Sequence, residues 1–143
     1  THCDHYLFAF STSVMPALAR RPPAEGMVTM QVINRTILNP VFLSAFFGTA
    51  GGCLLVLVVA VLRWSESGSI FLLAGSLLYL VGSSGVTMAC NVPRNNALER
   101  ADPKSQEAAR LWADYLREWM AWNHVRTVAA LAAAASLTLG LCA

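Results

Sequence analysis

Long uncharged segments dominate the pattern of hydrophobic and polar positions along this chain. Residues 41–62, 67–93 and 127–143 contain no charged side chain. A helix rises about 1.5 Å per residue, so roughly 20 apolar residues cross the hydrocarbon core of a bilayer. The pattern therefore predicts transmembrane helices at approximately 40–62, 68–91 and 122–142.

A shorter apolar segment precedes these three. Residues 6–19 are uncharged, but they are too few to cross a bilayer unless the helix begins further upstream. The sequence also starts without a methionine. We therefore expect a fourth span at approximately 5–20, with its first part truncated.

The segments between the spans have helical patterns of their own. Asn39-Pro40 and Asp102-Pro103 each place a capping side chain before a proline, which is typical of a helix start. Apolar residues then recur at three- and four-residue steps, which predicts an amphipathic helix at approximately 103–121 that continues into the last span. Its apolar positions are Ala108, Leu111, Trp112, Tyr115, Leu116, Trp119 and Trp122. A similar stripe, Met27, Met30, Ile33 and Ile37, predicts a helix at 24–38 on the membrane surface.

Basic residues predict the orientation of the spans. Nine of the ten Lys and Arg residues lie in the connections 20–40 and 92–125 or at their edge, and Arg63 is the tenth. Basic connections stay in the cytoplasm, so both termini are expected outside. We expect one all-α domain, residues 1–143: a four-helix transmembrane bundle with amphipathic helical extensions on the cytoplasmic side of a bacterial plasma membrane. Gly48 and Gly52 form a G-x-x-x-G pair that predicts a close helix contact.

Composition supports lipid as the main partner of this chain. Hydrophobic residues make up 56% of the sequence and charged residues 13%, against about 25% charged in soluble domains. The net charge of +2 and the lack of a basic run argue against a nucleic-acid partner. The four scattered cysteines are interpreted as small apolar residues rather than a disulfide frame. His2 and His5 lie one helical turn apart, but no second ligand pair accompanies them, so no metal site is predicted.

The first polar cluster, "NVPRNNAL", ends the second long uncharged segment. Pro93 is expected to end the helix there and to leave backbone carbonyls without partners. Two interpretations stay open for the side chains. They either satisfy those carbonyls or form the floor of a polar pocket at the membrane surface. The residues concerned are Asn91, Arg94, Asn95 and Asn96.

The second polar cluster, "WMAWNHVRT", stands at the start of the last span. Trp119 and Trp122 are typical of an interfacial aromatic belt, and Arg126 of a residue that extends toward the headgroups. His124 is either a structural hydrogen-bonding group or an imidazole that transfers a proton near neutral pH. Asn123 shares a helix face with Trp119 and Arg126.

The two clusters are expected to meet, because both lie at the same membrane side. Together they fit a flat, weakly acidic aromatic ligand, on which Trp side chains stack. Arg126 and His124 are the candidate catalytic residues: Arg126 would hold an oxyanion and His124 would move a proton. The candidate substrate-binding residues are Asn91, Arg94, Asn95, Asn96, Trp119, Trp122 and Asn123. The sequence indicates no metal and no cofactor, and it leaves the oligomeric state open.

Several of these runs resemble one family when taken together. They are "FAFSTSVMPALARRPPAEGMVTMQVINRTILNPVFLSAFFGTA", "NVPRNNAL" and "WNHVRTVAALAAAA", and they resemble the anthrone oxygenase-like membrane proteins over nearly the whole chain. "HCDH" departs from the family, which has apolar residues there. The resemblance implies a four-helix membrane domain, and some members are associated with the oxidation of anthrones to anthraquinones. The polar positions that match are Asn34, Asn39, Asn91, Asn95, Asn96, Trp119, Trp122, Asn123 and Arg126.

Two functions follow from the residues and the resemblance. The first is a membrane oxygenase that uses dioxygen on an anthrone-like phenolic, with His124 as base and Arg126 or Arg94 as partner of the oxyanion. The second is a non-catalytic membrane module that binds a lipophilic small molecule or a partner subunit. In that case the Asn and Trp clusters are purely structural.

Overall fold

The computed structural model describes residues 8–143, and in this part of the chain every regular element is helical. The all-α class predicted from the hydrophobic pattern is therefore confirmed. The motif that contains His2 and His5 lies outside the described residues.

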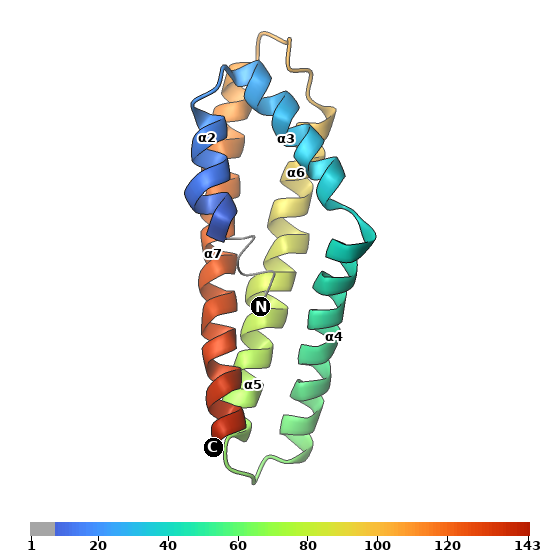
Figure 1. Cartoon of the computed structure of the whole chain (residues 1–143), viewed down its shortest axis with the longest axis vertical. Helices are drawn as coiled ribbons and strands as arrows, with labels where there is room; N and C mark the ends of the chain where they lie inside the picture. Colours follow the sequence, from blue (N-terminus) through green and yellow to red (C-terminus); the bar gives the residue numbers. More distant parts are fainter. Residues whose placement is uncertain (1–7) are drawn as a thin grey trace.

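Three long helices form the body of the molecule (Figure 1). The first is α4 (Pro40–Leu62), and the last is α7 (Ala108–Cys142). Between them runs a continuous helix, Ser69–Arg100, which consists of α5 (Ser69–Leu77), the π-helical segments η2 (Leu78–Gly85) and η3 (Thr87–Asn91), and α6 (Val92–Arg100). The three helices have 23, 32 and 35 residues, and each is long and apolar enough to cross a membrane. Membrane-protein character thus follows from three helices in the described residues.

The first apolar helix is shorter than the other three. It comprises η1 (Phe10–Val14) and α2 (Met15–Ala19) and lies beside α7 (Figure 1). The helix α3 (Pro23–Ile37) then runs diagonally across the bundle to the start of α4. The connections at 20–22 and 101–107 lie at the same end of the molecule, here named the basic end, while the 63–68 loop and the C-terminus lie at the opposite end (Figure 1).

The apolar stripe of α3 packs on other helices of the bundle. Met27 and Met30 are fully buried in a core that also contains Leu98 and Trp112. Gln31 fixes α3 to α6, because its Nε2 donates to the carbonyls of Leu98 at 2.8 Å and Ala101 at 3.1 Å. The basic end is therefore a small helical layer with its own core, stacked on the membrane-spanning part.

The helix also continues through Pro93, where the sequence predicted its end. Proline lacks an N–H and crowds the carbonyl four residues earlier, which normally kinks an α-helix. Here Pro93 falls in the first turn of α6, directly after the π-helical segment η3. Arg94 Nη1 donates to the carbonyl of Cys90 at 2.7 Å and so provides a partner in the turn before the proline. The polar cluster consequently extends the second long helix to Arg100.

Close helix packing occurs at glycines other than the predicted pair. A Cβ atom added at Gly75 would lie 3.0 Å from the Ala133 carbonyl oxygen and 3.0 Å from the Leu137 nitrogen of α7. By contrast, a Cβ added at Gly48 or Gly52 would meet nothing within 4 Å in the described structure. The predicted G-x-x-x-G contact is therefore wrong within this chain, and the tight interface joins α5 to α7.

We expect Gly75→Ala to destabilise the bundle and Gly52→Ala to leave it as stable or slightly more so. The first change forces backbone atoms apart, at a cost of about 1–3 kcal/mol. The second adds a methyl group into open space and gains up to about 1 kcal/mol of helix propensity. Thermal unfolding of both variants in the same detergent measures the difference, and equal melting temperatures would contradict this packing.

Candidate functional site

A line of polar side chains runs along one face of the Ser69–Arg100 helix. Its members recur every four residues: Tyr79, Ser83, Thr87, Asn91 and Asn95. In a regular α-helix four such steps rotate by roughly 160°, so the first and last side chains would point in nearly opposite directions. The π-helical turns of η2 and η3 have more residues per turn and offset that rotation. All five residues therefore line one cavity.

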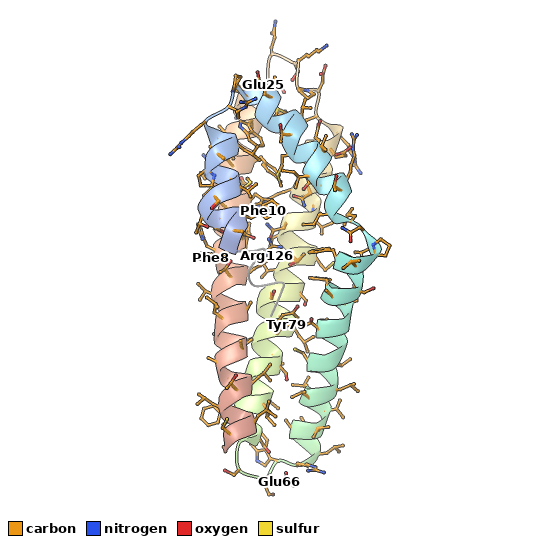
Figure 2. The ribbon with its side chains drawn as sticks, viewed as in Figure 1. Phe8, Phe10, Glu25, Glu66, Tyr79 and Arg126 are labelled. Carbon is orange, nitrogen blue, oxygen red and sulfur yellow. The ribbon has the colours of Figure 1, made fainter. Side chains whose placement is uncertain are left out.

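The cavity has a volume of about 120 Å³ and lies between this polar line and α7. Trp119, Asn123 and Arg126 form the α7 wall. Apolar side chains close the flanks: Phe10, Ile37, Leu38, Phe42, Phe46 and Val92. Figure 2 shows Arg126, Phe10 and Tyr79 well inside the length of the molecule, between Glu25 at the basic end and Glu66 at the other. The cavity thus combines aromatic walls with a polar face inside a membrane-spanning bundle.

Arg126 is the central charged group of the cavity. Its side chain is only 7% exposed. Nη1 donates to Thr87 Oγ1 at 3.1 Å, Nη2 donates to Asn123 Oδ1, and the guanidinium lies 5.6 Å from the centre of the Trp119 ring. These partners are all uncharged.

No aspartate or glutamate among residues 8–143 forms an ion pair with Arg126. Its Nε is buried and has no hydrogen-bond partner. A buried cation without a counter-charge is costly, and the cost falls when a negatively charged or strongly polar oxygen approaches. The guanidinium therefore leaves one uncompensated positive charge at the wall of the cavity.

Asn95 positions the aromatic wall. Its Oδ1 accepts hydrogen bonds from Trp119 Nε1 at 2.8 Å and from Tyr115 Oη at 2.9 Å. Tyr115 and Trp119 stack with ring centroids 6.3 Å apart, and the Phe10 ring centroid lies 5.7 Å from that of Trp119. One amide oxygen thus holds the Trp119 ring at a defined angle against the cavity.

Two further amides connect the walls. Asn91 is 1% exposed, and its Nδ2 donates to the Trp119 carbonyl at 3.4 Å, while its Oδ1 is buried without a partner. Asn123 is fully buried, and its Nδ2 donates to Ser11 Oγ at 2.6 Å. The first apolar helix therefore reaches the guanidinium of Arg126 through Asn123.

The structure brings five of the nine predicted site residues to the cavity: Asn91, Asn95, Trp119, Asn123 and Arg126. The other four lie outside its walls. Arg94 pairs with Glu118 at 2.8 Å, and its guanidinium lies 5.9 Å from the Trp122 ring. Asn96 and His124 are exposed. Of the two candidate catalytic residues, Arg126 thus lines the cavity and His124 does not.

Several residues of the cavity carry no clear signal in the sequence. Tyr79, Ser83 and Thr87 lie within an apolar span, although their four-residue spacing continues to Asn91 and Asn95. Ser11, Phe42 and Phe46 come from elements whose approach to the cavity has no local sequence signal.

Of the residues matched to the family, Asn39 caps α4 by accepting from the Phe42 N–H at 3.0 Å. No group of three or more His, Cys, Asp or Glu within residues 8–143 is arranged to hold a metal ion.

Fold and site together define a helical membrane protein with a buried, cationic, aromatic-walled cavity. The family model described as anthrone oxygenase matches residues 41–136, which cover nearly all of α4, the Ser69–Arg100 helix and most of α7. The chain therefore belongs to the anthrone oxygenase family, as its sequence motifs indicated. No curated protein and no solved structure matches it.

Asn95→Ala is expected to destabilise the protein, whereas Asn96→Ala is not. The first variant leaves two donors, Tyr115 Oη and Trp119 Nε1, without their acceptor, at about 1–3 kcal/mol for each donor that stays unpaired. The second variant changes the neighbouring, exposed asparagine. Melting temperature and tryptophan fluorescence in detergent measure both effects. If the two variants behave alike, Asn95 does not hold the aromatic wall.

Proposed function

We propose that the cavity binds a flat aromatic molecule with an enolisable or acidic oxygen, and that the protein oxidises an anthrone-like phenolic with dioxygen. The observation that carries this proposal is the buried guanidinium of Arg126, whose Nε faces no partner and whose charge meets no described carboxylate. Membership of the anthrone oxygenase family supports the choice of substrate class.

The cavity walls suit the ligand in shape and in charge. Trp119, Phe42 and Phe46 offer aromatic faces to a planar ring system. Arg126 offers a cation to the oxygen that becomes negative when an anthrone loses a proton from its methylene carbon. Because the Arg126 guanidinium is buried, this electrostatic stabilisation is stronger than it would be in solution.

The reaction then needs only the enolate and dioxygen. The methylene proton passes to water, and the resulting enolate oxygen is held by Arg126. The enolate transfers one electron to dioxygen, and the carbon radical and superoxide combine to form a carbon–oxygen bond. Protonation gives a hydroperoxide, which loses water to leave the second carbonyl of the quinone. In total, one anthrone and one dioxygen give one anthraquinone and one water.

The orientation of the protein is part of the same proposal. The basic end carries most of the Lys and Arg residues, and such segments remain in the cytoplasm. In a bacterial plasma membrane the connections 20–40 and 92–125 would then be cytoplasmic. The cavity would lie within the membrane-spanning part, toward its cytoplasmic side.

Arg126→Gln is expected to reduce turnover of a hydroxylated anthrone by about a hundredfold to a thousandfold, the usual loss when an oxyanion donor is removed. Arg126→Lys should recover part of this rate, because the charge stays while the Nε–H is lost. Arg117→Gln, which changes an exposed arginine of the same helix, is the matched control. Dioxygen uptake by purified protein, corrected for spontaneous oxidation, measures the rate. Unchanged uptake in Arg126→Gln would contradict the proposal.

His124→Ala tests whether an imidazole takes the proton. Since His124 is exposed and outside the cavity, we expect turnover within about twofold of the parent. A collapse of turnover with an unchanged melting temperature would assign His124 as the base. If the parent protein binds the anthrone but takes up no dioxygen, the result favours a non-catalytic binding module instead.

A further inference from the structure

A second hollow adjoins the cavity at the basic end. This vestibule has a volume of about 200 Å³ and lies between α3 and α6. Asn34, Asn96 and Glu99 contribute polar side chains to its walls. It shares four lining residues with the cavity, namely Ile37, Leu38, Val92 and Asn95. The two hollows are therefore neighbours on opposite sides of the same short wall.

The rim of the vestibule is charged, so it opens toward water or lipid headgroups rather than hydrocarbon. Arg35 and Glu99 both line it, and the Arg35 side chain is 68% exposed. On the inner wall, Asn34 is 9% exposed, and its side chain contacts Tyr115. The vestibule thus has the chemistry of a passage from the aqueous side.

An ion pair joins the two sides of the vestibule. Arg35 Nε on α3 donates to Glu99 Oε1 on α6 at 2.6 Å. Gln31 lies one turn earlier on α3 and donates to the carbonyls of Leu98 and Ala101. It thereby holds the other end of the contact between α3 and α6. The wall shared with the cavity begins at Ile37, two residues after Arg35. Separation of Arg35 from Glu99 would therefore loosen α3 near Ile37 and Leu38, where that wall begins.

We propose that the vestibule is the water-side entrance of the cavity and that the Arg35–Glu99 ion pair latches it. The ligand class that fits is an amphiphilic aromatic that arrives from the aqueous side. The entrance rests on the cavity being the ligand site of the proposed function, but its test requires no turnover. Val92, half-buried and shared by both hollows, is the reporter position.

The first experiment measures access to Val92→Cys in a full-length background whose four native cysteines are replaced. The protein is reconstituted in liposomes, and a charged, membrane-impermeant methanethiosulfonate is compared with a lipid-soluble maleimide. Val81→Cys is the control, because Val81 lies exposed on the apolar part of the same helix. We expect the charged reagent to label Val92→Cys and not Val81→Cys. Labelling of Val92→Cys by the lipid-soluble reagent alone would overturn the entrance.

The second experiment tests the latch by charge reversal. Arg35→Glu places two carboxylates opposite each other, and we expect labelling of Val92→Cys to become about two- to fivefold faster. Arg35→Glu with Glu99→Arg restores an opposite-charge pair and should return the rate to that of the parent. If the single and double variants are labelled at the same rate, the ion pair is not the latch. Melting temperatures of both variants separate opening of the entrance from general unfolding.

The outcome is independent of catalysis. Water-side labelling together with an Arg126→Gln variant of normal turnover would retain the entrance and reject the proposed reaction. Labelling by the lipid-soluble reagent alone, together with loss of turnover in Arg126→Gln, would reject the entrance and support the proposed reaction.

Discussion

The site depends on one constraint, which is that a cation buried among apolar helices must be held by dipoles. Arg126 sits between Thr87 of η3 and Asn123 of its own helix, and Asn123 is held in turn by Ser11. Three separate segments are thereby fixed around one guanidinium. Since each partner is neutral, the charge is oriented but not cancelled. The cavity therefore contains one uncompensated positive charge beside its polar and aromatic walls.

The aromatic side of the cavity depends on the position of Trp119. Trp119 belongs to both the core of the basic end and the wall of the cavity, so the two layers of the molecule share it. Asn95 sets its orientation through Nε1, and Arg126 lies over its face. A change in the packing of α3 or α6 would therefore reach the cavity through this ring, which links the basic end to the cavity wall.

Much of the fold could be predicted, because the length of each uncharged segment and the helix-start signal at Asn39-Pro40 depend only on the local sequence. The start of α7 at Ala108 rather than Pro103 follows from a turn in which Asp102 Oδ1 accepts from the Lys104 N–H. The site was only partly predictable. Polar types and spacing indicated Asn91, Asn95 and Arg126. Whether Asn91 and Asn95 face the same side as Tyr79 and Ser83 depends on π-helical turns that no residue pattern indicates. His124 has suitable chemistry, yet helix rotation directs it outward.

The π-helical turns also determine how this cavity can change over evolutionary time. In an ordinary span, a deletion of one residue rotates everything beyond it by about 100° and destroys a binding face. Within Leu78–Asn91 the helix already contains wide turns, so losing a residue there would convert a wide turn into a regular one and re-aim Tyr79 and Ser83 while Asn91 and Asn95 stay in place. Short insertions and deletions in this stretch, rather than substitutions, would then be the economical way to redirect the polar face toward a ligand of different shape.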